Sequence, residues 1–154
     1  MVHIHHRGEA AVPTEFAFAY MSDFDNLKEW LYGFQRARLV GDIPHRQVGA
    51  MYEGSVKIGA TLKATIRVTE FVENALLCTE SVSGFSNQTR WEFESLGPER
   101  GALTVDVDYQ LPGGLAGRAL GAAIEPFVSI AIRHTEHKLR QVLEERYRQS
   151  KTSV

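Results

Sequence analysis

A few residues with hydroxyl groups occur among apolar residues that share one face of a predicted helix or strand. They are the first candidates for polar contacts with a bound molecule. Thr135 lies in the middle of an apolar helical stripe, and Tyr52 and Tyr109 lie on the apolar faces of strand-like segments. A buried hydroxyl needs a hydrogen-bond partner. Thr135 would either donate to the carbonyl of Ala131 one helical turn earlier or offer its hydroxyl to a bound molecule. Either tyrosine would bond a ligand carbonyl or hydroxyl.

Glu80 is the carboxylate that could act as a general base, depending on which face of residues 76–83 points inward. If Glu80 and Cys78 point inward, Glu80 is a buried carboxylate able to accept a proton. If the register is shifted by one residue, Leu77 and Thr79 point inward and Glu80 is solvated. We favour the second register and interpret Cys78 as a small apolar filler.

The histidines first suggest a metal site. His3, His5 and His6 are close together, and His3 and His5 share one face of an extended segment. No cysteine or carboxylate cluster accompanies them in the sequence, so a solvated strand is the favoured interpretation. His134 and His137 are one helical turn apart and are interpreted as surface or rim residues. We therefore expect no metal and no other cofactor, and we assign no catalytic residue.

Composition limits the classes of function. The chain has 154 residues, of which 44% are hydrophobic and 23% charged, as in an ordinary globular domain. We expect a single domain over residues 1–149 and a frayed tail over 150–154. The net charge of −2 disfavours nucleic acid as the main partner, because phosphate binding needs a basic surface.

The cysteine content and the pattern of the first residues suggest where in the cell the protein is located. The one cysteine can form no internal disulfide, and the first residues lack the basic-then-apolar pattern of a signal peptide. No apolar run approaches the ~20 residues of a membrane span. The sequence therefore predicts a cytoplasmic protein without an integral membrane segment, and it is compatible with a monomer or a homodimer.

The elements that must position these residues follow from the periodicity. Residues 2–10 alternate loosely, as a strand does. Pro13 begins a helical stretch, and a second short helix over residues 24–30 ends at Gly33. The period then changes to two until Pro112, with short turns between segments, which predicts an antiparallel meander. The alternating segments are 34–40, 48–58, 62–69, 76–83, 90–94 and 103–110.

A long helix is predicted over residues 115–148, with Pro126 kinking or restarting it. Gly117 and Gly121 lower the helix propensity of its first turns. These turns are therefore either a gate through which a ligand enters or a place where the helix packs closely on the sheet. An apolar stripe follows one helical face, with charged residues opposite. The stripe is Ile124, Val128, Ala131, Thr135, Leu139 and Val142, flanked by Phe127, Ile132 and Leu143; the residues opposite are Arg133, Glu136, His137, Arg140 and Glu144.

The sheet and the helix together predict the architecture. A sheet of about seven strands has one apolar face, and only the long helix can cover it. A strongly curved sheet around one helix leaves space for an internal cavity, although a fully packed core is equally compatible with the pattern. The fold class is therefore α+β, with a curved antiparallel sheet around the C-terminal helix and two short helices between the first two strands.

Three segments carry a family resemblance. Residues 23–30 (DFDNLKEW), 89–94 (TRWEFE) and 109–114 (YQLPGG) resemble the second short helix, the sixth strand and the approach to the last helix of the helix-grip superfamily (SRPBCC). That superfamily includes lipid-transfer domains related to the steroidogenic acute regulatory protein (START), the birch-pollen allergens and bacterial polyketide cyclase/dehydrase-like proteins. The resemblance covers about residues 2–146. It implies a cavity under the long helix for lipids, sterols, polyketides, quinones or plant-type hormones.

Three functions remain open. The leading hypothesis is a non-enzymatic binder or carrier of a small hydrophobic molecule. One alternative is a polyketide cyclase/aromatase-type enzyme, in which Tyr52, Tyr109 or Glu80 would transfer protons. Another is a protein-interaction module, which would need an exposed apolar patch. The residues predicted to line the cavity are Tyr52, Trp91, Phe93, Tyr109, Phe127, Ala131 and Thr135.

Overall fold

The computed structural model describes residues 1–152 and has the predicted α+β architecture. One strand comes first, short helices follow, and six further strands precede one long helix. The elements are β1 (Val2–Ala10), α1 (Thr14–Ser22), the 3-10 turn η1 (Phe24–Asn26), α2 (Leu27–Trp30), β2 (Phe34–Val40), β3 (Met51–Ile58), β4 (Ala60–Val72), β5 (Leu76–Gly84), β6 (Ser86–Gly97), β7 (Arg100–Gln110) and α3 (Gly114–Thr152).

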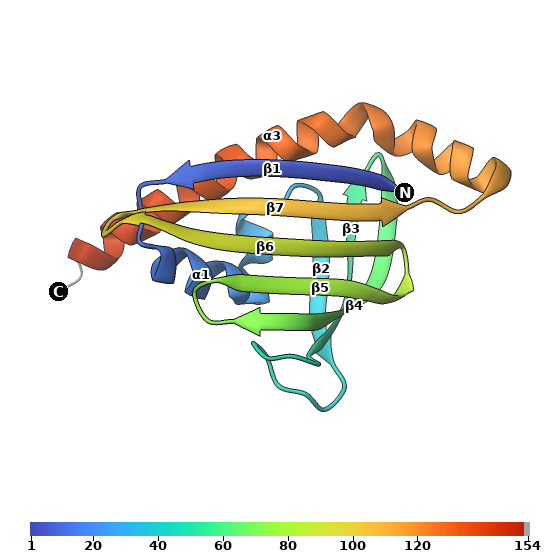
Figure 1. Cartoon of the computed structure of the whole chain (residues 1–154). Coiled ribbons are helices and arrows are strands. Elements are labelled where there is room, and N and C mark those ends of the chain that lie inside the picture. The colour runs from blue at the N-terminus through green and yellow to red at the C-terminus, as the bar shows by residue number, and fades with distance from the viewer. Residues whose placement is uncertain (153–154) are drawn as a thin grey trace.

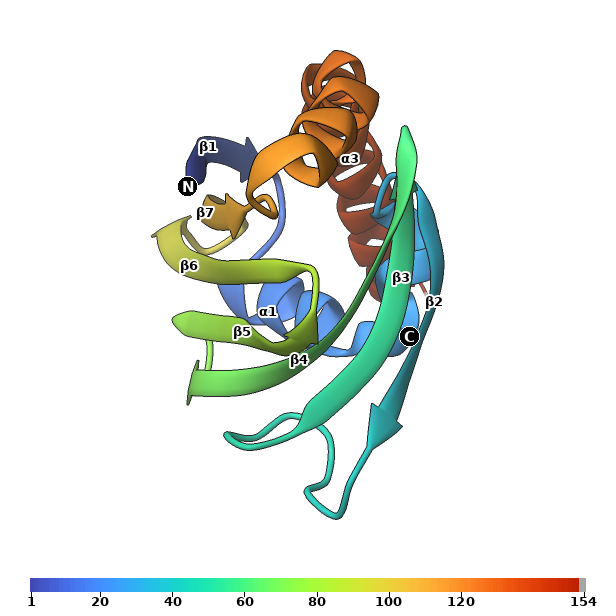
Figure 2. The same cartoon turned by 90° about the vertical axis from the view of Figure 1, so that its right-hand side faces the viewer.

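The seven strands form one antiparallel sheet in the order β1-β7-β6-β5-β4-β3-β2. Strands β2 to β7 are a simple meander, and β1 then pairs with β7 at the other edge. The sheet curves strongly, and α3 lies across its open side, between β1 and the strands β3 and β2 (Figure 2). The helix-grip prediction is confirmed.

Local sequence explains the short helices. Pro13 directly precedes α1, where its fixed φ suits a helix start. Asp23 begins the 3-10 turn, because its side chain accepts a hydrogen bond from the backbone N–H of Asp25 at 3.1 Å. Gly33 follows α2 with φ +74, and a Cβ there would come within 2.2 Å of the Lys57 carbonyl oxygen. Glycine is therefore required where the chain turns from α2 into β2.

The long helix α3 continues through Thr152, beyond the predicted end at residue 148. The predicted tail is thus helical as far as Thr152, and residues 153–154 lie outside the described part. Pro126 does not interrupt the helix, but α3 changes direction along its length (Figure 1). By length and composition alone α3 is apolar enough to cross a membrane, so the expectation of no integral membrane segment stays a prediction. In this fold it covers the sheet.

The packed core occupies the part of the interior next to α1 and α2. Phe18 is fully buried, and its ring contacts those of Phe71 and Phe93 at centroid distances of 5.3 and 5.1 Å. Trp30 from α2 and Leu143 from α3 belong to the same cluster. The core therefore joins both short helices to the sheet and to the C-terminal half of α3. Several of these core residues, Trp30 and Leu143 among them, also form part of the wall of an internal cavity.

Candidate functional site

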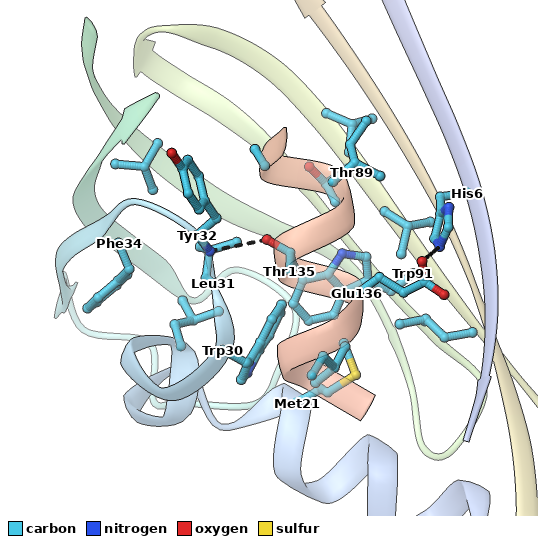
Figure 3. A pocket seen from close by; sticks show the side chains of 18 of the residues that line it. His6, Met21, Trp30, Leu31, Tyr32, Phe34, Thr89, Trp91, Thr135 and Glu136 are labelled. Carbon is cyan, nitrogen blue, oxygen red and sulfur yellow. Dashed lines mark hydrogen bonds and ion pairs between the residues drawn. The ribbon is translucent and has the colours of Figure 1, made fainter. Parts of the chain in front are cut away.

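A cavity of about 490 Å³ lies between the concave face of the sheet and α3. Most of its lining is apolar, with contributions from β1, β3, β4, β6, β7 and α3 and from the short helices. Figure 3 shows side chains from β1, β6, α3 and the short helices around this space. A concave, mostly apolar pocket with a few polar groups is typical of a small-molecule site.

Six of the seven residues predicted for the cavity line it, and Phe127 does not. Phe127 is 39% exposed and lies beside Gly59 in the turn between β3 and β4. The six are Tyr52, Trp91, Phe93, Tyr109, Ala131 and Thr135.

The face of α3 that meets the cavity is turned relative to the predicted stripe. At about 100° per residue, the lining positions are centred roughly 50° beyond the stripe, toward Ile132. This rotation moves Phe127 out of the lining and brings in Glu136 and Arg140, which were predicted on the opposite face. The prediction for these three residues is wrong because apolar spacing alone did not show where the sheet edges would contact the helix.

Tyr52 has a buried phenol whose hydroxyl group has a hydrogen-bond partner within the chain. It is 4% exposed, its ring packs against Phe24 at 4.6 Å, and its hydroxyl lies 3.0 Å from Nδ1 of His45. Burial raises the pKa of Tyr52 above that of a free phenol. The group is therefore neutral at physiological pH and can exchange hydrogen bonds without carrying charge.

Tyr109 differs, because its hydroxyl has no hydrogen-bond partner among the described residues. Its ring packs against Phe85 at a centroid distance of 5.7 Å. Burial is the main cause that raises the pKa of Tyr109, with the charge of Glu125 adding to it. Its neutral hydroxyl is available to a molecule in the cavity.

Thr135 connects α3 to the loop that follows α2. Its Oγ1 accepts a hydrogen bond from the backbone N–H of Tyr32 at 3.1 Å (Figure 3). One of the two acceptor positions of the hydroxyl is thus used by the protein itself, a partner that neither alternative drawn from the sequence included. Its hydroxyl proton remains available for donation to an acceptor.

His6 and Glu136 form a polar pair on the cavity wall that the sequence analysis missed. Nε2 of His6 lies 3.2 Å from Oε2 of Glu136 (Figure 3). Arg140 donates to Oε1 of the same carboxylate at 2.5 Å. His6 shares the inward face of β1 with Ile4 and Gly8, and this alternation was the available signal. The pair connects the edge strand β1 to α3, and 130 residues separate its members in the sequence.

The register of β5 removes Glu80 from the cavity. Leu77 and Thr79 are buried, whereas the carboxylate of Glu80 accepts a hydrogen bond from Arg67 at 2.7 Å outside the cavity. Cys78 shares the outer face with Glu80 but is itself buried, and this burial raises the pKa of its thiol to about 11. Because both side chains lie on the outer face of the sheet, neither can act as a base or nucleophile on a molecule in the cavity.

The remaining histidines lie outside the cavity. The ring of His134 packs against Tyr32 at 5.2 Å, and His137 is exposed. His3 and His5 lie on the outer face of β1, next to Asp106 and Asp108 of β7. The carboxylates that were absent from the neighbouring sequence are therefore supplied by a distant strand.

The fold and its cavity define a helix-grip protein, and the comparisons agree. The sequence matches the family described as polyketide cyclase/dehydrase and lipid transport over residues 1–144. The chain therefore belongs to this family. A search among curated proteins gives no sequence match.

Several solved structures share the fold. A START superfamily protein from Mycobacterium smegmatis is 21% identical with a TM-score of 0.66, covering 91% of this chain and 98% of that one. The Zhui aromatase/cyclase from Streptomyces sp. R1128 is 15% identical with a TM-score of 0.72, covering 94% of each chain. Norcoclaurine synthase from Thalictrum flavum is 14% identical with a TM-score of 0.63, covering 94% and 87%. At these identities the likeness shows a common fold.

Proposed function

We propose that the protein binds and carries a small, largely apolar molecule in the cavity beneath α3. The observation that carries this proposal is the apolar cavity of about 490 Å³, which is large enough for a lipid, sterol, polyketide or quinone fragment. The hydroxyls of Tyr109 and Thr135 would orient the polar end of such a molecule. We assign this carrier to the cytoplasm, as a monomer or homodimer.

Anilinonaphthalene sulfonate (ANS) tests the cavity directly, because its fluorescence rises in an apolar environment. We expect saturable binding to the native protein and at least a tenfold loss of affinity in Ala131→Trp, whose indole would fill the cavity. Ile130→Trp is the matched control, because Ile130 is adjacent in sequence but 42% exposed. Equal binding in both variants would place the dye elsewhere. Native mass spectrometry of protein from its source would then identify the class of a retained ligand.

A second candidate function is proton-transfer catalysis of the polyketide cyclase/aromatase type, favoured by the His6–Glu136 pair. His6 would accept a proton from carbon next to a substrate carbonyl, and the carboxylate of Glu136 would stabilise the resulting imidazolium. Arg140 would hold that carboxylate in position. These groups lie on the wall of an otherwise apolar cavity, where positioned charges act strongly.

The ketone 2-tetralone is a suitable probe, since exchange of its α-protons in D₂O can be followed by NMR. We expect the native protein to accelerate this exchange, His6→Phe to abolish the acceleration, and Glu136→Gln to reduce it. ANS affinity should change less than threefold in both variants, which separates loss of chemistry from loss of the cavity. Exchange that is equally fast in His6→Phe would exclude His6 as the proton acceptor.

A further inference from the structure

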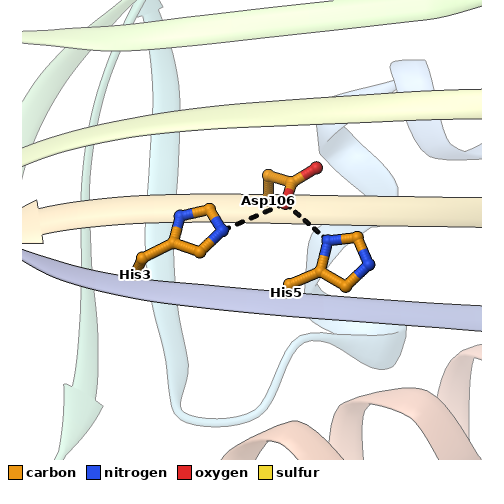
Figure 4. A group of neighbouring side chains, drawn as sticks. All are labelled: His3, His5 and Asp106. Atoms are coloured by element: carbon orange, nitrogen blue, oxygen red, sulfur yellow. Dashed lines mark hydrogen bonds and ion pairs between the residues drawn. The ribbon is translucent and has the colours of Figure 1, made fainter.

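The outer face of the sheet brings two histidines and two aspartates together. In the pairing of β1 with β7, His5 lies opposite Asp106 and His3 lies opposite Asp108. The alternate residues of both strands, such as His6 and Val105, face the cavity instead. This cluster is therefore separated from the cavity by the sheet itself. Figure 4 shows His3, His5 and Asp106 side by side on β1 and β7.

Three potential ligand atoms in the cluster lie close together. Oδ1 of Asp106 lies 2.6 Å from Nδ1 of His5 and 3.3 Å from Nε2 of His3. One ligand atom from each of these three residues lies within 4.8 Å of the others. Atoms bound to one tetrahedral zinc ion at ~2.0–2.1 Å lie about 3.3 Å apart. Small rotations of exposed histidine side chains would complete that arrangement.

Asp108 provides a further feature of a metal site. Nδ1 of His3 lies 2.7 Å from Oδ1 of Asp108, which orients the ring and leaves Nε2 directed toward Asp106. Metal-binding histidines commonly donate their other ring N–H to a carboxylate in this way, which fixes the tautomer. Asp108 would thus be a positioning residue, while His3, His5 and Asp106 would supply the ligand atoms.

The surrounding charges also favour a cation. The cluster contains two carboxylates, and its histidines are neutral when they bind a metal. Nearby cations are already paired elsewhere, since Arg7 contacts Glu9 and Arg90 contacts Glu92 and Glu70. Imidazole nitrogen and carboxylate oxygen together suit zinc and related transition ions rather than magnesium or calcium.

We propose that His3, His5 and Asp106 bind one Zn²⁺ ion on the outer face, with water in the remaining coordination position. Such an ion would cross-link the edge strand β1 to β7. The site is independent of the cavity and therefore of the proposed ligand-binding function. It also departs from the sequence expectation of no metal, because Asp106 lies 101 positions after His5 in the chain and was not visible as a neighbour.

Isothermal titration calorimetry with ZnCl₂ tests the site on tag-free protein that has been treated with a chelator. We expect one ion per chain, and at least a tenfold weaker affinity in His5→Ala and in Asp106→Asn. Asp108→Asn should weaken binding less than these two variants do. His137→Ala is the control, because this exposed histidine on α3 lies outside the cluster, and it should bind as the native protein does.

Thermal unfolding gives a second readout that depends on the cross-link. Zn²⁺ should raise the Tm of the native protein and of His137→Ala, but not that of Asp106→Asn. Circular dichroism of the metal-free variants confirms that each has folded. The proposal is overturned if the native protein shows no saturable zinc binding. It is equally overturned if His5→Ala and Asp106→Asn bind with unchanged affinity.

Discussion

The backbone N–H of Tyr32 donates to Oγ1 of Thr135 across 3.1 Å, and this bond joins the loop before β2 to the middle of α3. Both residues line the cavity. The hydroxyl oxygen thus satisfies a backbone donor at the cavity wall while its proton remains available. A single threonine therefore contributes both to the attachment of α3 and to the polarity of the site.

Thr135→Val should destabilise the protein by about 1–3 kcal/mol, because it leaves the N–H of Tyr32 without an acceptor while preserving the shape of the side chain. Thr135→Ser keeps the acceptor oxygen and should cost less than Thr135→Val. Urea unfolding monitored by circular dichroism measures both values. If the native protein and Thr135→Val have the same free energy of unfolding, the hydrogen bond makes no net contribution to stability.

Gly59→Ala should destabilise the turn between β3 and β4 strongly. Gly59 has φ +74, and a Cβ there would lie 1.9 Å from the carbonyl oxygen of Ala123 in α3. Backbone strain alone costs about 1–3 kcal/mol, and the clash adds to it. Gly113→Ala is the control, because a Cβ at Gly113 meets no atom within 4 Å. Chemical denaturation of the two variants should therefore give clearly different midpoints.

Cys78 should react slowly with thiol reagents in the native state. Burial is the first cause that raises the pKa of this thiol to about 11, and an unperturbed cysteine has a pKa of about 8.5. The reactive thiolate is thus more than about a hundredfold scarcer at pH 8, and its amount rises with pH through about 11, where half of the thiol is ionised. Ellman's reagent should label urea-unfolded protein much faster than native protein. Equal rates would show that the thiol is accessible and unperturbed.

The first turns of α3 should exchange amide hydrogens faster than the turns that follow. Gly117 and Gly121 lower the helix propensity of residues 115–124, and Leu115 is 81% exposed, whereas the later turns are held by buried Ala131, Leu139 and Leu143. If this segment is the gate of the cavity, adding ANS should slow its exchange, as measured by mass spectrometry.

Close packing is the competing explanation for the glycines in that segment. A Cβ at Gly117 would come within 1.7 Å of the Pro112 carbonyl oxygen, so this glycine has a local packing role as well. Equal protection across residues 115–124 and 128–142, or no response to ANS, would favour packing alone.

The fold could be predicted because each hydrophobic period persists over a long stretch of sequence, and the changes from one period to the next are marked by Gly33 and Pro112. Alternation between Gly33 and Pro112 defined an antiparallel meander, and the stripe after Pro126 defined the helix that covers it. The side of α3 that meets the cavity was less predictable. Glu136 and Arg140 are charged and looked solvated, yet they line the cavity because β1 and its His6 lie beside them.

The polar clusters could not be predicted because they depend on pairing between the ends of the chain. Nothing near His3 and His5 in sequence indicates that Asp106 and Asp108 will lie opposite them. For Glu80, two registers of β5 remained open. The β-bulges between β4 and β5 shift the pairing along these strands, and no sequence signal fixed their positions.

Pairing of β1 with β7 also determines the order in which the chain can fold during synthesis. Residues Val2–Ala10 are synthesised before the rest of the sheet, but their pairing partners in residues 101–109 are made about a hundred residues later. The meander from β2 to β7 can form from local hairpins, whereas β1 must wait with its backbone groups unpaired. Such distant contacts slow folding. Pairing of β1 at this edge is therefore a late step of folding, and until β7 has been made the backbone groups of β1 bond to water.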